Sequence, residues 1–127
     1  MNEEPRKKRI LVVDDDSNVT TYLTKVLSGH GFEAWPVNDP LNVLRRAAEF
    51  HPDLVILDFI MPQLLGSEVA VQLKSYKTTQ NVPVIFLSGM TDEDHRLIAT
   101  FSGAAAYLEK PIDPRKLIEA IRTQLGP

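Results

Sequence analysis

Polar side chains that could carry chemistry directly follow several short apolar runs of this sequence. The first run is followed by three aspartates, the third ends in one, and a serine and a lysine close the fourth and fifth: Asp14, Asp15, Asp16, Asp58, Ser88 and Lys110. Carboxylates, a hydroxyl and an ammonium around one crevice would supply a nucleophile, a metal site, a hydrogen-bond donor and a positive charge. Phosphoryl transfer needs these parts. Because crowded carboxylates repel one another unless a cation holds them, an all-oxygen site favours magnesium.

These residues can converge only if the runs before them are neighbouring strands. Five apolar runs alternate with five amphipathic stretches, a rhythm that predicts an α/β fold with helices on both faces of a parallel sheet. Consecutive aliphatic residues predict central strands at Ile10 to Val13, Leu54 to Leu57 and Val84 to Leu87. The run Glu33 to Val37 contains Pro36 and is expected at one edge, with Ala105 to Leu108 at the other.

Residues typical of helix starts lie between the apolar runs. Asp39 before Pro40 and Asp113 before Pro114 are typical of a capping aspartate and a first-turn proline, and Ser67 opens a helix after Gly66. A fourth helix is expected to open at Thr91 to Glu93. Apolar residues recur at helical spacing in five stretches: Val19, Leu23, Val26 and Leu27; Leu41, Leu44, Ala47 and Ala48; Val69, Ala70 and Leu73; Leu97, Ile98 and Phe101; Leu117, Ile118, Ile121 and Leu125.

The strand order decides whether the acidic residues meet. In a doubly wound sheet of order 2-1-3-4-5, the first and third strands flank the point where successive connections leave in opposite directions. Ligands bind beyond the carboxyl ends of the strands at that point. With this order, the acidic cluster at Asp14 to Asp16 and the carboxylate of Asp58 converge.

Composition limits the other possibilities. A chain of 14.3 kDa with 43% hydrophobic and 24% charged residues is typical of one globular domain. The absence of cysteine excludes disulfides and thiolate metal sites, and the apolar runs are too short to span a membrane. The cytoplasm is the expected location. A net charge of -3 gives no reason to expect nucleic-acid binding, and residues 1–8 are interpreted as a charged lead-in to a domain at 9–127.

Four segments carry a resemblance to a known family. ILVVDDD, DLVILDFIMP, PVIFLSG and AAYLEKP resemble, in order and spacing, the receiver domains of two-component systems. The resemblance covers nearly the whole chain and implies a flavodoxin-like fold. It also implies a phosphoryl group received from a histidine kinase or a histidine phosphotransfer protein, and a magnesium ion that manganese can replace. Expected further partners are a downstream effector domain or protein and a second copy in a phosphorylation-dependent homodimer.

The resemblance assigns the metal and phosphoryl sites to individual residues. Asp58 resembles the phosphoacceptor of the family, and Asp14 and Asp15 resemble its acidic pair. Magnesium is expected to bind Asp15, Asp58 and the backbone carbonyl of Ile60, with Asp14 acting mostly through bound water. The implied protein is a switch that phosphorylates and dephosphorylates itself, and not an enzyme that turns over an external substrate.

Further residues are assigned to catalysis and switching by the same resemblance. Ser88 and Lys110 complete the catalytic set, and the peptide bond from Lys110 to Pro111 is expected to be cis. Tyr107 resembles the switch aromatic, which would follow the Ser88 hydroxyl inward and alter the surface of the fourth and fifth helices. At Leu65 the sequence departs from the commonest pattern, because many members carry an acidic residue just before the glycine.

Two apolar residues bear on how long the phosphoryl group would last. Hydrolysis of an aspartyl phosphate needs a water aligned opposite the leaving oxygen of Asp58. By resemblance, Ile60 and Met90 lie near that approach. Neither side chain can hydrogen-bond a water, so slow hydrolysis is expected.

Other functions stay open at this point. Acidic residues after a strand are often only helix caps, and Asp16 fits that role. Asp14 and Asp16 form the D-x-D of haloacid-dehalogenase-like phosphohydrolases, which would make Asp14 the nucleophile, but no later acidic pair follows a strand. A flavodoxin-like cofactor carrier would have acidic strand ends that repel a flavin phosphate. A degenerate receiver would serve only as a docking module.

Overall fold

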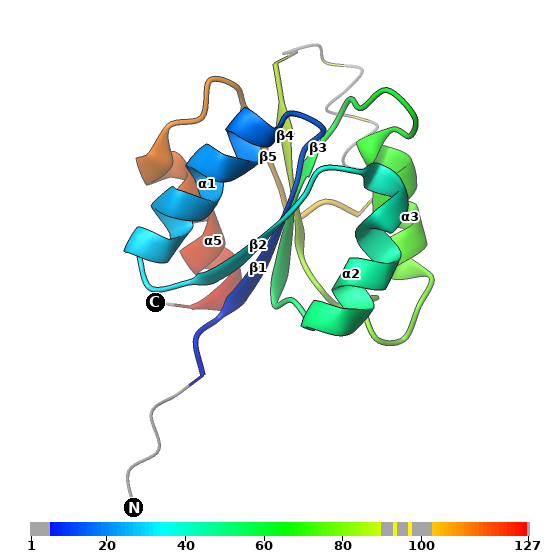
Figure 1. Ribbon diagram of the computed structural model, residues 1–127, viewed down its shortest axis with the longest axis horizontal. Coiled ribbons are helices and arrows are strands. Elements are labelled where there is room, and N and C mark those ends of the chain that lie inside the picture. Colours follow the sequence, from blue (N-terminus) through cyan, green and yellow to red (C-terminus); the bar gives the residue numbers. More distant parts are fainter. Residues whose placement is uncertain (1–5, 90–92, 94–96, 98–102, 127) are drawn as a thin grey trace, which may run out of the picture.

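Five parallel strands form one sheet in the computed structural model, which describes residues 6–89, 93, 97 and 103–126. The strands lie in the order β2-β1-β3-β4-β5 (Figure 1). Their bounds are Arg9–Val13 for β1, Glu33–Val37 for β2, Leu54–Asp58 for β3, Val84–Ser88 for β4 and Ala106–Glu109 for β5. The predicted fold class and order are confirmed. The fifth strand starts and ends one residue later than expected.

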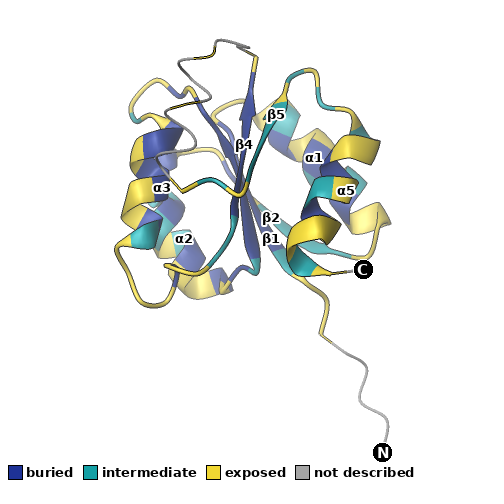
Figure 2. Ribbon diagram, turned by 180° about the vertical axis from the view of Figure 1, so that it is seen from behind, coloured by how far each residue is buried: buried dark blue, intermediate teal, exposed yellow. Residues whose placement is uncertain are grey.

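Helices cover both faces of the sheet and give the domain two cores. Helices α1 (Ser17–Gly29) and α5 (Pro114–Leu125) pack on one face, and α2 (Val43–Phe50) and α3 (Gly66–Lys74) pack on the other (Figures 1 and 2). Successive side chains of β1 point into alternate cores. Ile10 and Val12 pack under α1 and α5, and Leu11 and Val13 pack under α2 and α3. This double coverage explains the unbroken aliphatic runs of the central strands.

The second helix differs from its prediction. Asp39 caps a short 3-10 helix at Pro40–Asn42, labelled η1, and the α-helix begins only at Val43. The tighter winding of the first turn shifts the buried face to Val43, Ala47 and Phe50. Leu41 and Ala48, expected on the same apolar face as Ala47, are both exposed, Leu41 at 64%, so these two assignments were wrong.

The helix starts follow the capping signals. Asp16 and Asp113 each accept a hydrogen bond from the backbone two residues on, at the starts of α1 and α5. Helix α3 begins at Gly66, one residue before the expected Ser67.

Of the fourth predicted helix, only Glu93 and Leu97 lie within the described residues, and both are helical and exposed. The other positions predicted for it lie outside them.

The amino-terminal end of the sheet is held by charged and aromatic contacts. The Asp53 carboxylate accepts a hydrogen bond from the Arg9 backbone at 2.7 Å and pairs with Arg6 at 3.2 Å. The Arg9 guanidinium donates to the Phe50 carbonyl at 2.8 Å and lies over the Phe50 ring. Trp35, a partly buried residue packed on the core, stacks on the same ring with centroids 4.3 Å apart. These contacts fix the start of β1 against the end of α2.

Candidate active site

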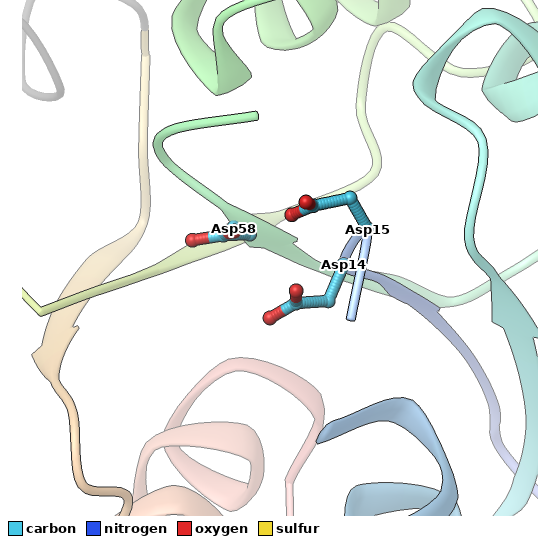
Figure 3. A group of neighbouring side chains, drawn as sticks. All are labelled: Asp14, Asp15 and Asp58. Atoms are coloured by element: carbon cyan, nitrogen blue, oxygen red, sulfur yellow. The ribbon is translucent and has the colours of Figure 1, made fainter. Parts of the chain in front are cut away.

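Three aspartates converge at the carboxyl end of the sheet. Asp58 is the last residue of β3, and Asp14 and Asp15 directly follow β1, which pairs with β3. One carboxylate oxygen of each lies within 4.8 Å of the others (Figure 3). Asp14 and Asp58 are buried, at 1% and 6% exposure, whereas Asp15 is exposed. The predicted convergence is therefore present in the structure.

Lys110 reaches the same carboxylates from the end of β5. Its Nζ lies 2.8 Å from the Asp14 carboxylate and 3.3 Å from that of Asp58. The backbone N–H of Lys110 donates to the Ser88 carbonyl at 2.7 Å, which ties the ends of β4 and β5 together. The peptide bond from Lys110 to Pro111 is cis, as predicted. One ammonium is thus shared between two buried carboxylates.

The electrostatics of the site favour a protonated Asp58 more than an isolated aspartate would. Burial, and then the negative charge of Asp14, raise the pKa of Asp58 from 3.8 to about 6, although Lys110 opposes the shift. Burial lowers the pKa of Lys110, but the hydrogen bond to Asp14 and the negative charges around it outweigh this, so its pKa lies above the ordinary value. Lys110 stays charged near neutral pH, and its single charge does not offset the carboxylates around it.

The position of Asp14 is fixed by its neighbours. Its Oδ1 accepts the backbone N–H of Asp16 at 2.9 Å, and its Oδ2 accepts Lys110. The Asn38 side chain donates to the Asp14 carbonyl and to the Thr20 hydroxyl, each at 2.9 Å. Asn38 was not among the residues predicted from the sequence, although it directly follows β2 and so lies at the same edge of the sheet as the other polar residues. Asp14 is held rigidly, with both carboxylate oxygens engaged.

Of the remaining predicted residues, three lie on or just after strands of the same sheet. Ser88 is buried at the end of β4, and Ile60, two residues beyond Asp58, is 41% exposed. Tyr107, on β5, is partly buried, and its ring meets that of Phe59 at a centroid distance of 6.0 Å. Phe59 directly follows Asp58, so Tyr107 contacts the residue next to the expected phosphoacceptor. Met90 lies outside the described residues.

The donor set fits a hard divalent cation. The carboxylates of the cluster offer only oxygen, and the first shell of magnesium or manganese is built from such ligands. Burial and then the negative charge of Asp14 raise the pKa of Asp58, and a bound cation would stabilise its charged form. Asp15 is exposed and open to solvent, whereas Asp14 is already engaged by Asp16 and Lys110. The residues present are those expected of an acidic metal pocket.

The fold and the site define a doubly wound α/β domain with an acidic pocket at its topological switch point. The family model described as the response regulator receiver domain matches residues 10–122. The chain therefore belongs to the response regulator receiver domain family.

Curated relatives of this chain include response regulators. It is 36% identical over 119 residues to the DNA-binding response regulator MtrA of Mycolicibacterium paratuberculosis, covering 94% of this chain and 52% of that protein. The alkaline phosphatase synthesis transcriptional regulatory protein PhoP of Bacillus subtilis is 32% identical over 118 residues, covering 93% and 48%. The chain thus spans about half the length of these curated relatives.

A solved structure agrees in fold over almost the whole chain. The CheY-like response regulator receiver domain protein of Methanospirillum hungatei superposes with a TM-score of 0.87 at 26% identity, covering 94% of each chain. The chain is thus a phosphorelay receiver domain by family and by fold. Within the described part of the chain, no helix combines the length and the apolar character needed to cross a bilayer.

Proposed function

We propose that this receiver domain accepts a phosphoryl group on Asp58 in a magnesium-dependent reaction. The observation that carries the proposal is the convergence of Asp14, Asp15 and Lys110 on the buried carboxylate of Asp58. In this reaction a carboxylate oxygen of Asp58 attacks phosphorus, and the bond from phosphorus to the donor's imidazole nitrogen breaks. The imidazole is the leaving group, and the product is an aspartyl phosphate.

Each neighbouring residue has a distinct part in this proposal. Lys110 contacts an oxygen of the transferring group and offsets its negative charge. Asp15, Asp58 and the Ile60 carbonyl would hold magnesium, Asp14 would act mostly through bound water, and the cation would neutralise charge at the phosphoryl oxygens. Asp14 also orients Lys110, because the two share a 2.8 Å ion pair.

Output in this proposal is a shift between two conformations. The Ser88 hydroxyl moves toward the phosphoryl group and Tyr107 follows, which changes the surface around β5 and α5. The 6.0 Å contact between the rings of Tyr107 and Phe59 supports a link from the phosphoacceptor to this surface.

The proposed partners follow from the family. A histidine kinase or a histidine phosphotransfer protein supplies the phosphoryl group in the cytoplasm. The receiving partner is an effector domain or protein, or a second copy of this chain. The relatives named as a DNA-binding response regulator and a transcriptional regulatory protein make transcription the favoured output. The receiver switches state and does not turn over an external substrate.

The phosphohydrolase alternative is weaker because of the surroundings of Asp14. Both Asp14 oxygens accept protein hydrogen bonds, one of them from the Lys110 ammonium, and such bonds lower the nucleophilicity of a carboxylate. Asp16, the second aspartate of that motif, caps α1 with its side chain. Asp58 is the better nucleophile in this geometry.

Acetyl phosphate tests the proposal without a cognate kinase. The wild-type protein, incubated with acetyl phosphate and Mg²⁺, should gain one phosphoryl group by intact mass, and EDTA should prevent the gain. Asp58→Asn should not be labelled, while the matched variant Asp39→Asn, at the cap of η1, should be labelled like the wild type. Labelling of Asp58→Asn, mapped by peptide analysis to Asp14 or Asp15, would contradict the assignment.

A further inference from the structure

Gly66, the first residue of α3, lies against the backbone of the expected phosphoacceptor. A Cβ built at this position would overlap the carbonyl oxygen of Asp58 and would lie 2.9 Å from the Cα of Phe59. Both neighbours are backbone atoms in the buried end of the sheet. A side chain at position 66 could not be accommodated by a rotamer change, so either α3 or the Asp58–Phe59 backbone would have to move.

A hydrogen bond ties the same two segments together. The backbone N–H of Gly66 donates to the Phe59 carbonyl at 2.8 Å, and the N–H of Phe59 donates to the Leu87 carbonyl at 2.9 Å. The backbone that leaves Asp58 is therefore held between β4 on one side and the start of α3 on the other. Ile60, whose carbonyl is the proposed metal ligand, is the next residue along this segment.

We propose that Gly66 is a positioning residue for the phosphorylation site. The missing side chain lets α3 approach closely enough to fix the backbone from Asp58 to Ile60, and this sets the Asp58 carboxylate and the Ile60 carbonyl relative to Asp15. Phosphoryl transfer depends on such placement more than on covalent chemistry by the protein. The inference rests on the proposed function, since it concerns the geometry of that site.

A purely structural role for Gly66 makes a different prediction. If the glycine serves only packing, an added methyl group lowers stability, and the folded fraction keeps its normal site. If the glycine positions the site, folded protein carrying the methyl group binds Mg²⁺ weakly and is labelled slowly even at saturating Mg²⁺. Metal affinity and the saturated labelling rate therefore separate the two roles, whereas stability alone does not.

Gly66→Ala and Gly29→Ala form a matched pair for this test. Both glycines are terminal residues of helices, but a Cβ at Gly29 would meet nothing within 4 Å. Each variant of the 127-residue chain is compared with the wild type by Mg²⁺ titration calorimetry, by the acetyl phosphate labelling rate at saturating Mg²⁺, and by urea unfolding. If Gly66→Ala is partly unfolded, all proteins are measured in trimethylamine N-oxide, which favours the folded state.

The expected result is a loss of at least about tenfold in both Mg²⁺ affinity and saturated labelling rate for Gly66→Ala, as misplacement of reacting groups produces. Gly29→Ala should stay within about twofold of the wild type, in line with the small effects of substitutions at open sites. Folded Gly66→Ala with wild-type affinity and rate would overturn the inference, and so would a variant that stays unfolded in the osmolyte. Absence of labelling in the wild type would instead overturn the proposed function.

Discussion

The aspartates at the two ends of the sheet have opposite electrostatic surroundings. At the amino-terminal end, Asp53 accepts the Arg9 backbone N–H and pairs with the Arg6 guanidinium. At the carboxyl-terminal end, Asp58 lies close to Asp14 and Asp15, and shares the single ammonium of Lys110 with Asp14. The carboxylate of Asp53 has donors of its own, whereas that of Asp58 has too little positive charge around it.

This difference separates a carboxylate that stabilises the fold from one that is kept ready for chemistry. Hydrogen bonds and ion pairs lower the free energy of a charged carboxylate in the folded state, whereas burial and neighbouring negative charge raise it. The pKa of Asp58, at about 6, records that cost. A bound divalent cation would remove this free-energy cost. The relief of repulsion between the carboxylates would therefore contribute part of the metal affinity of the site.

Among the variants that test this comparison between the two sheet ends, Asp15→Ala should have the largest effect, which is on Mg²⁺ affinity. This change removes an exposed proposed metal ligand, and we expect Mg²⁺ affinity to fall on the order of 100-fold, or roughly 3 kcal/mol. Without metal the variant should be slightly more stable than the wild type, because one repulsive charge is gone. Calorimetric titration and thermal unfolding check both parts. Unchanged Mg²⁺ affinity would show that Asp15 is not a ligand, and loss of folding would show that Asp15 has a structural role instead.

A smaller effect, on stability alone, is expected from Asp53→Ala at the opposite end. Two donors, the Arg9 N–H and the Arg6 guanidinium, lose their acceptor, so the free energy of unfolding should fall by about 2 kcal/mol. Urea unfolding measures this change. Mg²⁺ affinity and acetyl phosphate labelling should stay unchanged in the folded protein. A large loss of labelling would show that the two ends are coupled and would break the comparison.

The smallest effect concerns the lifetime of the phosphoryl group. Ile60 is 41% exposed beside the site and cannot orient a water, so Ile60→Asn should speed autodephosphorylation by a few-fold, about threefold to tenfold. Loss of phosphorylated protein is followed by intact mass with Mg²⁺ present and the phosphodonor removed. Leu65→Asn, at a second exposed position in the same loop, serves as the control. Equal decay in Ile60→Asn and the wild type would refute the shielding role.

Much of the fold could be predicted because the local signals agree with the tertiary arrangement. Unbroken aliphatic runs indicated strands covered on both faces, and Pro36 indicated an edge strand. Helical spacing was less reliable at Leu41, since the sequence does not show that η1 winds more tightly before α2 begins. The altered winding over Pro40–Asn42 leaves Leu41 on the surface.

The chemical residues of the site were also accessible from sequence, because each directly follows or ends a strand. Its supporting contacts were not. Two of these contacts depend on how segments distant in the sequence pack together. They are the hydrogen bond from the Asn38 side chain to the Asp14 carbonyl and the close approach of Gly66 to the Asp58 backbone. The raised pKa of Asp58 depends on burial and on the distance to Asp14, which spacing along the chain does not give. The roles of Asp58, Ile60, Ser88 and Tyr107 stay predictions until they are measured.

The central claim is that the Asp58 carboxylate costs stability without metal and that a cation removes this cost. Its most direct test is the difference in free energy of unfolding between wild type and Asp58→Asn, measured against pH with and without Mg²⁺. Because the folded pKa is raised from 3.8 to about 6, the metal-free wild type should lose stability relative to the variant as pH rises through that window.

The relative loss should level off above about pH 6 at no more than about 3 kcal/mol, at 1.36 kcal/mol for each pKa unit. Saturating Mg²⁺ should shrink or reverse the difference at pH 7, because the cation binds the folded wild type through Asp58. Asp39→Asn, at an exposed cap, controls for loss of a carboxylate in general. A difference that is constant from pH 4 to 7, and unaltered by Mg²⁺, would contradict the account.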